Sequence, residues 1–298
     1  MQSRLTSGLN SLSEGVPPHI WFIVSAVFHY LGPAFAVLLF PAVGVLGVAW
    51  FRIATAALFF APLTNPLRVF LSANLPMRFL LVAMGLCLAV MNSSFYLALD
   101  RLPMSLVASM EFIAVMFLAC LGRRHSRNLL ALAMVVTGVV ILIDVKWVGD
   151  PLGLFWAALN AGLFAAYVAI GHKMAEAGAA QGVDFLGTAM AIAFLIILPI
   201  GMLEALPAFG SPAIVLAAVG VGLCSSVIPY ICDQLAMARL PRASFALLLS
   251  LLPVSAAVIA ALVLRQIPSG LDLAGIALVV AGVALHVPAP PSPNKEKD

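Results

Sequence analysis

Long continuous runs of apolar residues dominate the chain, and polar residues are concentrated in the short intervals between these runs. A helix that crosses a bilayer needs about 20 mostly apolar residues. The runs do not alternate between apolar and polar positions, which is typical of membrane-spanning helices rather than of barrel strands. The ten expected spans are residues 19–38, 43–63, 79–99, 103–122, 128–144, 152–172, 184–203, 212–238, 242–264 and 271–288.

The amino-acid composition agrees with this pattern. Of the 298 residues, 63% are hydrophobic and 9% are charged, whereas soluble domains have roughly 45–50% and about 25%. Such a composition excludes a water-soluble globular protein and a disordered one. The sequence therefore predicts an all-α integral membrane protein whose main solvent is the lipid bilayer. The eighth run, 212–238, is longer than one span requires and is expected to be bent or partly interfacial.

Lysine and arginine residues predict the orientation, because they are enriched in cytoplasmic loops. With the amino terminus in the cytoplasm, eleven of them fall on the inner side and three on the outer side, and Arg52 lies within a span. Both termini of this multi-pass protein are therefore expected in the cytoplasm. The net charge of +3, with no clustered basic patch, indicates no nucleic-acid partner.

Two short motifs recur in the two parts of the chain. Arg101-Leu102-Pro103 matches Arg239-Leu240-Pro241, and Gly138-Val139-Val140 resembles Gly282-Val283-Ala284. We interpret the chain as two five-helix repeats, 1–147 and 150–288, followed by a disordered cytoplasmic tail, 289–298. Because five is odd, the second repeat enters the membrane from the opposite side, as in many secondary transporters whose ligand site lies near the midplane.

Ionisable side chains within a span cost about 2.5–3.5 kcal/mol on insertion scales and should face a cavity or a partner. Arg52 lies near the middle of the second span. It is expected either to pair with a substrate carboxylate or to form a salt bridge with Glu111 or Asp233. Glu111 and Asp233 could each carry a proton or serve as a structural partner of Arg52.

Further polar residues lie within the spans. His29 either titrates near neutral pH or is a hydrogen-bonded core residue. The uncharged polar atoms of Asn92, Tyr96, Tyr230 and Gln234 either suit a zwitterion such as an amino acid or join helices to one another. Together with Arg52, Glu111 and Asp233, these residues are the candidates for a transport path.

Helix-breaking residues accompany this polar cluster. Gly32 and Pro33 are expected to interrupt the first span, and Pro229 and Pro253 the eighth and ninth. These four residues are candidate hinges, with ordinary proline kinks as the alternative. We find no metal-ligand spacing, phosphate-binding loop, disulfide framework or catalytic triad order, so neither an enzyme nor a cofactor is expected. No feature of the sequence specifies an oligomeric state.

One stretch of sequence has a family resemblance. The run MNSSFYLALDRLP from Met91 to Pro103, followed by Glu111-Phe112, resembles the drug/metabolite transporter superfamily. The closer similarity is to its EamA-type branch, which includes bacterial threonine and homoserine export. Phe40-Pro41 with Arg52, and Pro229-Tyr230 with Asp233, also resemble this branch, although the acid in its eighth helix is Glu.

The resemblance implies two inverted EamA repeats around a central cavity, with the fifth and tenth helices packed to one side. It implies an inner-membrane secondary transporter that exports amino acids or related small metabolites. Export by such a transporter can be coupled to the movement of protons. Efflux of aromatic amino acids, nucleosides or drugs is the alternative. The chain departs from the exporter pattern at Val37, Val115, Phe164, Leu252 and Gln266.

Overall fold

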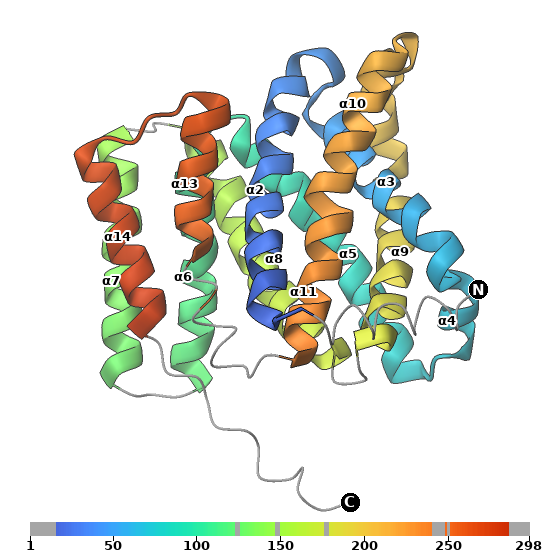
Figure 1. Ribbon diagram of the computed structural model, residues 1–298, viewed down its shortest axis with the longest axis horizontal. Coiled ribbons are helices and arrows are strands. Elements are labelled where there is room, and N and C mark those ends of the chain that lie inside the picture. The colour runs from blue at the N-terminus through green and yellow to red at the C-terminus, as the bar shows by residue number, and fades with distance from the viewer. Residues whose placement is uncertain are drawn as a thin grey trace, which may run out of the picture.

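A computed structural model describes residues 16–122, 126–146, 150–175, 179–239, 248 and 251–285 (Figure 1). Throughout these ranges the secondary structure is helical, and no strand occurs in them. The carboxyl-terminal tail 289–298, and the Leu240 and Pro241 copy of the repeated motif, lie outside them. The helices of the first part are α2 (Pro18–Val43), α3 (Val45–Thr64), α4 (Pro66–Ser72), α5 (Leu75–Leu99), α6 (Met104–Gly122) and α7 (Ser126–Lys146). Those of the second part are α8 (Pro151–Ala175), α9 (Ala179–Ala205), η1 (Leu206–Gly210), α10 (Pro212–Gly222), η2 (Leu223–Val227), α11 (Ile228–Arg239), α13 (Leu251–Leu264) and α14 (Gly270–Leu285).

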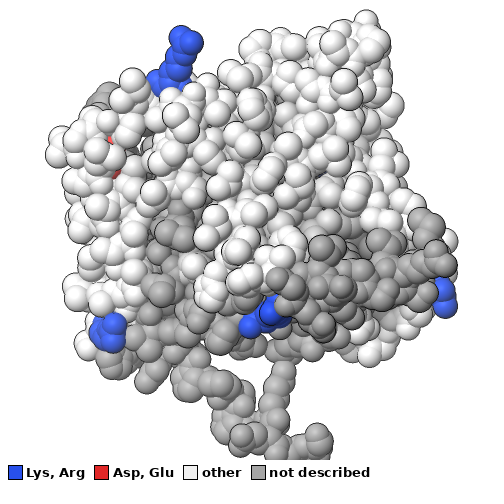
Figure 2. Space-filling model, viewed as in Figure 1, with Lys and Arg blue, Asp and Glu red and all other residues white. Residues whose placement is uncertain are grey.

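Six stretches of this helical structure are long and apolar enough to cross a membrane within the described ranges, and four further apolar helices there are shorter. The shorter ones are Met104–Ala114, Ser126–Leu142, Leu252–Leu264 and Gly270–Leu285. Large apolar side chains such as Leu58, Leu216 and Leu262 are exposed on the outside of the bundle. On the face seen in Figure 2, the coloured Lys and Arg residues lie at the upper and lower edges, with an almost uncharged band between them. These features define an integral membrane protein.

Local sequence explains where several helices begin. Prolines occupy the first or second position of α2, α4, α5 and α10, where a missing N–H costs no helical hydrogen bond. The side chain of Asn74 accepts a hydrogen bond from the Met77 N–H and caps α5. Asp150 caps α8 in the same way through the N–H groups of Leu152 and Gly153. The starts of these helices are therefore encoded in the local sequence.

The eighth apolar run differs from a regular helix in its middle. The α-helical segments α10 and α11 are joined by the π-helical turn η2, which ends just before Pro229. Proline lacks the N–H that continues a regular helix, and π-turns are a common response to such disruption and often occur at functional sites. By contrast, α2 continues through Gly32 and Pro33, so the expected interruption of the first span is absent.

The main helix packing joins the two parts of the chain. Helix α3 packs along α9, α7 along α14, α5 along α8, and α2 along α11. In Figure 1, α7 and α14 form one side of the molecule, and α3, α9 and α4 lie at the opposite side. The described residues of the two parts therefore share one core and do not form two separate bundles.

Small residues allow α7 and α14 to approach closely. A Cβ atom added to Gly138 would lie 2.6 Å from the carbonyl oxygen of Gly275. A Cβ atom added to Gly282 would lie 2.7 Å from the carbonyl oxygen of Ala131. Because these atoms belong to the backbone, they cannot move aside as a flexible side chain would. Small residues at such contacts are typical of membrane helix pairs, which are held together by van der Waals packing.

We expect Gly138→Ala to lower the thermal denaturation temperature of the detergent-purified protein by several degrees. The added methyl group would force α7 and α14 apart, and overpacking of this kind costs about 1–3 kcal/mol. Gly162→Ala on α8 is the matched control, because nothing lies within 4 Å of its added Cβ. Equal denaturation temperatures for the two variants would show that the close approach of α7 and α14 contributes little stability.

A surface ion pair joins the end of α5 to the start of α8. Arg101 Nη1 donates to Asp150 Oδ2 at 2.8 Å. This hydrogen bond, together with those from the N–H groups of Gly153 and Leu152, holds the pKa of Asp150 below its usual value. A lowered folded-state pKa stabilises the protein above the unfolded pKa, and the benefit is lost as the pH falls through the folded value.

Asp150→Asn should therefore lower the denaturation temperature slightly at pH 7, and the difference from the wild type should shrink as the pH approaches 3. Asparagine keeps the capping oxygen and removes only the charge, and exposed ion pairs contribute little. Thermal unfolding measured across this pH range, with Asp100→Asn as the neighbouring control, tests the expectation. A difference that grows towards acidic pH contradicts it.

Candidate functional site

In the described part of the chain, four side chains that carry formal charges are buried. Asp272 at the start of α14 accepts hydrogen bonds from Ser269, and the other three lie within the helical bundle. Arg52 on α3 and Glu111 on α6 are each 2% exposed, and Asp233 on α11 is 8% exposed. Among the described residues, none of the three forms a direct ion pair. Each is instead held by uncharged polar groups of another helix, so the expected salt bridge of Arg52 with Glu111 or Asp233 is not present in this structure.

Arg52 is anchored on the irregular segment between α10 and α11. Its Nε donates to the hydroxyl oxygen of Ser226, and its Nη2 donates to the carbonyl oxygen of Ser225, each at 2.9 Å. Pro229 has no N–H to donate to the Ser225 carbonyl four residues earlier, so this carbonyl is available to a partner from outside the helix. The carbonyl that loses its regular helical partner at Pro229 is therefore the same one that accepts the hydrogen bond from Arg52.

The third nitrogen of the guanidinium group differs from the other two. Nη1 of Arg52 is buried and has no hydrogen-bond partner within the described part of the chain. The guanidinium carbon lies 5.3 Å from the centre of the Tyr96 ring and 6.0 Å from that of Phe95. The hydroxyls of Tyr96 and Tyr230 interact with the group electrostatically, but neither makes a hydrogen bond of normal geometry. Arg52 thus keeps a buried N–H group available for a ligand.

Glu111 is held from two sides. Asn160 on α8 donates through Nδ2 to Oε1 at 2.8 Å, and Tyr30 on α2 donates through its hydroxyl to Oε2 at 3.2 Å. Tyr30 and Asn160 are 0% and 1% exposed. Each carboxylate oxygen therefore has one neutral donor, and the two donors come from opposite parts of the chain.

Arg52 and Glu111 line one internal cavity between α2, α3, α5, α6, α8 and α11. Its empty volume is about 300 Å³, of which about 10 Å³ can hold the centre of a water molecule. That space suits about one water molecule. The residues that line it are His29, Arg52, Met91, Asn92, Phe95, Glu111, Asn160, Phe164, Tyr167 and Tyr230.

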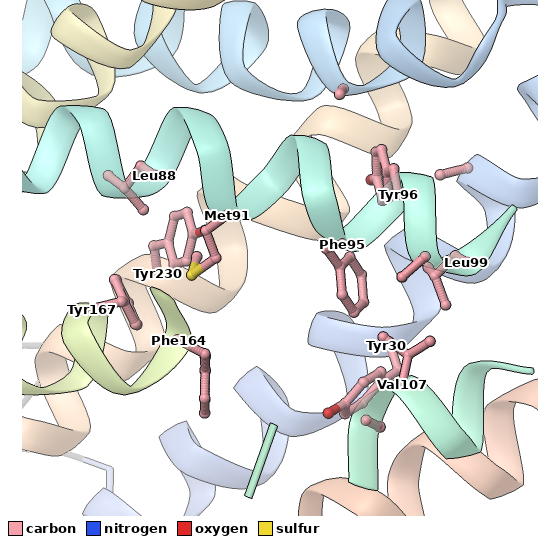
Figure 3. Packing of buried hydrophobic residues seen from close by; sticks show 14 of the residues in the cluster. Tyr30, Leu88, Met91, Phe95, Tyr96, Leu99, Val107, Phe164, Tyr167 and Tyr230 are labelled. Atoms are coloured by element: carbon pink, nitrogen blue, oxygen red, sulfur yellow. The ribbon is translucent and has the colours of Figure 1, made fainter. Parts of the chain in front are cut away.

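Aromatic rings form much of the cavity wall. Figure 3 shows Met91 and Phe95 of α5 directed toward the space between Tyr230, Phe164 and Tyr30. Phe164 and Tyr167 stack with ring centres 6.2 Å apart, and Tyr167 lies 5.7 Å from Tyr230. The cavity therefore combines a guanidinium group, a carboxylate and aromatic faces, which suits a small ligand bearing charge.

The structure brings together most of the residues expected to form a transport path. His29, Asn92 and Tyr230 share the cavity with Arg52 and Glu111, while Tyr96 packs beneath the guanidinium group without lining the cavity. The amide nitrogen of Asn92 donates to the Leu88 carbonyl of its own helix. Phe164 packs edge-on against His29, with ring centres 6.4 Å apart.

Asp233 and Gln234 have a different placement. Asp233 does not line the cavity, and its Oδ1 accepts a short hydrogen bond from the Ser25 hydroxyl, which joins α11 to α2. Gln234 belongs to α11, but its side chain lies outside the described residues. Asp233 is therefore a contact between helices beside the site.

Among the site residues that were not expected from the sequence are three side chains that hydrogen-bond to Arg52 or Glu111. Asn160, Tyr30 and Ser226 hold the two charged groups, and all three are polar residues within apolar runs. The presence of Asn160 inside the sixth run is a signal that could have been used, because amides are rare in lipid-facing helices. The adjacent serines before Pro229 are a second signal.

No group of three or more His, Cys, Asp or Glu side chains that could hold a metal ion occurs in the part of the chain that the structure describes. The charged groups found in the cavity are Arg52 and Glu111, flanked by the His29 imidazole.

The fold and the cavity define a polytopic membrane protein with a buried polar site between its two parts. Residues 151–287 match the model of the EamA-like transporter family. A solved crystal structure with 18% sequence identity has the same fold, with a TM-score of 0.62, and the match covers 90% of this chain and 95% of the other.

Curated relatives are consistent with this classification over most of the chain. The threonine/homoserine exporter RhtA of Salmonella typhimurium LT2 is 29% identical over 255 residues, which cover 84% of each chain. RhtA of Escherichia coli K12 is 28% identical over the same length and share. The chain is therefore similar to the EamA-like transporter family and to these exporters, as the sequence motifs indicated.

Proposed function

We propose that this protein is a secondary transporter that exports small amino acids of the threonine and homoserine type, or related small metabolites, across the bacterial inner membrane. Transport would proceed by alternating access, with both termini in the cytoplasm. The buried guanidinium of Arg52 would bind the substrate carboxylate. Asn92 and Tyr230 would line the path, and protons are the proposed coupling ion.

The observation that carries this proposal is the incomplete coordination of Arg52. Two of its nitrogens are fixed by Ser225 and Ser226, and Nη1 has no partner among the described residues although it is buried beside a cavity. An unpaired buried charge is costly unless a ligand completes its coordination. Carboxylates are among the groups that a guanidinium binds most strongly. The RhtA relatives are named as exporters of amino acids, which carry that group.

The helix packing supports ten spans in two inverted repeats, 1–147 and 150–288. We pair α2 with α8, α3 with α9, α5 with α10 and α11, α6 with α13, and α7 with α14. When each helix is replaced by its partner in this pairing, the contact of α5 with α8 becomes the contact of α11 with α2. In the same way, the contact of α6 with α8 becomes the contact of α13 with α2, and all four contacts occur in the structure. The pairs of α3 with α9 and of α7 with α14 correspond to themselves, as a two-fold relation requires.

The contacts between α7 and α14 follow the same relation. Gly138 meets the Gly275 carbonyl, and Gly282 meets the Ala131 carbonyl. Gly138 on α7 corresponds to Gly282 on α14, and Ala131 corresponds to Gly275. The two residues of each pair are 144 positions apart. An odd number of spans in each repeat makes the paired helices run in opposite directions.

The size of the cavity supports a conformational cycle. Its accessible space suits about one water molecule and is too small for an amino acid. The substrate would enter only after helices on one side separate. Gly32 with Pro33, Pro229 and Pro253 remain candidate hinges for this movement, because helix breaks absorb rearrangement in transporters.

A second candidate substrate class is supported by the aromatic wall. Phe95, Phe164, Tyr167 and Tyr230 surround the charged groups and offer faces on which a ring can stack. Aromatic amino acids, nucleosides or planar drugs would use these faces. An aromatic amino acid would also engage Arg52, whereas an uncharged nucleoside would not.

A thermal-shift screen of the detergent-purified protein against amino acids, nucleosides and cationic drugs distinguishes these substrate classes. A bound ligand stabilises the folded protein by RT ln(1 + [L]/Kd). We expect stabilisation by small neutral amino acids, and its loss in Arg52→Gln. Stabilisation by nucleosides or drugs alone would instead favour the second class, and stabilisation of Arg52→Gln equal to that of the wild type would contradict the assigned role of Arg52.

A further inference from the structure

We propose that Glu111, positioned by Tyr30 and Asn160, binds the ammonium group of a zwitterionic substrate whose carboxylate binds Arg52. This inference rests on the proposed function and deepens it, because it requires both charges of an α-amino acid. It assigns Glu111 a binding role in place of a structural pairing with Arg52.

Two opposite charges are held apart in one cavity. Arg52 and Glu111 both line it, yet no direct ion pair joins them. Opposite charges attract strongly in a low-dielectric interior, so a gap between them needs other contacts to maintain it. Ser225 and Ser226 hold the guanidinium, while Tyr30 and Asn160 hold the carboxylate.

Arg52 and Glu111 can each form further hydrogen bonds. A carboxylate offers about four lone-pair sites, and Glu111 uses one on each oxygen. The guanidinium has its Nη1 available. Each charge is therefore fixed by neutral partners on one side and can accept an additional charged partner. A zwitterion placed between them would neutralise both.

The cavity wall beside Glu111 is aromatic. The ring of Phe164 lies in the cavity wall with Glu111 and Asn160, and it packs 6.5 Å from the ring of Phe112, the neighbour of Glu111 on α6. Aromatic faces also attract cations. A cationic group is thus favoured at the Glu111 end of the cavity, and an anionic group at the Arg52 end.

Two series of probe ligands test the assignment by removing one charge at a time. The first is L-threonine with 3-hydroxybutanoate, which lacks the amino group, and 1-amino-2-propanol, which lacks the carboxylate. The second is L-phenylalanine with 3-phenylpropionate and phenethylamine. Dissociation constants come from thermal shift and from inhibition of amino-acid counterflow in proteoliposomes.

The wild type should bind at least one of the two amino acids about 10²-fold more tightly than its deaminated analogue, because that analogue leaves the Glu111 charge unpaired. In Glu111→Gln this preference should fall to within about threefold, mainly through weaker binding of the amino acid. Glutamine keeps the size and can still bond to Tyr30 and Asn160, so the loss reports the charge. Arg52→Gln should abolish the preference of the wild type for the amino acid over its decarboxylated analogue.

Asp233→Asn is the matched control, because it neutralises another buried acid, which lies outside the cavity lining. It should retain the wild-type preference for the ammonium group. A Glu111→Gln protein that binds amino acids with an unchanged preference overturns this inference and leaves the proposed export function intact. Failure of the wild type to bind either amino acid overturns both.

Discussion

Replacing Arg52 with glutamine should reduce amino-acid counterflow in proteoliposomes by about 10²–10³-fold. Removing one partner of a buried, hydrogen-bonded charge pair costs about 2–5 kcal/mol, and each 1.4 kcal/mol corresponds to a tenfold change. Glutamine still donates hydrogen bonds but cannot neutralise a carboxylate. Arg52→Lys should retain more activity, at about a tenth of the wild type, because a single ammonium cannot hold Ser225, Ser226 and a ligand together.

Arg101→Gln provides the control for this result. Arg101 is an exposed arginine that pairs with Asp150 at the surface, away from the cavity lining. We expect its counterflow to stay within about threefold of the wild type. If Arg52→Gln is folded, as judged by thermal unfolding and a monodisperse elution profile, and transports as fast as Arg101→Gln, then Arg52 has no part in substrate binding.

Replacing Gly32 with alanine should produce the largest loss of stability among the glycine variants. A Cβ atom there would lie 2.5 Å from Ser225 Cβ and 2.6 Å from the Ser225 Cα and backbone nitrogen. Because α2 and η2 touch through backbone atoms, the helix would have to shift. Ser225 also supplies a carbonyl to Arg52, so the shift would disturb the guanidinium. We expect a fall in denaturation temperature of about 5–10 °C together with weaker amino-acid binding.

Gly220→Ala on α10 is the matched control for Gly32→Ala. Nothing lies within 4 Å of its added Cβ, and alanine favours helix over glycine, so stability should be equal or slightly higher. Both variants are compared by thermal unfolding in the same detergent. If Gly32→Ala unfolds at the temperature of Gly220→Ala, then α2 does not depend on close contact with η2.

The positions of the apolar helices could be predicted from the sequence because a span must satisfy its backbone hydrogen bonds internally. The expected span 43–63 corresponds to α3 (Val45–Thr64), and 152–172 corresponds to α8 (Pro151–Ala175). The short helix α4 (Pro66–Ser72) was not expected, because its seven residues carry no recognisable periodic signal. The eighth run was expected to be bent or partly interfacial, but its π-helical turn η2 was not expected, because the apolar pattern does not specify the hydrogen-bond register within a helix.

The charged residues of the site could be identified from the sequence, but their partners could not. Arg52 and Glu111 are conspicuous in apolar runs because burying a charge is costly. Which groups face them depends on the rotation of each helix, which a single sequence does not specify. For the same reason Gly32 was expected to interrupt a helix, whereas it provides a close contact with Ser225 inside a continuous one.

The central claim is that the cavity holding Arg52 is the substrate site of an amino-acid exporter. Counterflow of radiolabelled threonine or homoserine into proteoliposomes preloaded with the unlabelled amino acid tests it most directly. We predict saturable, trans-stimulated uptake by the wild type that falls to the level of empty liposomes in Arg52→Gln. Absence of trans-stimulated uptake for small neutral amino acids by a folded wild-type protein would contradict the account.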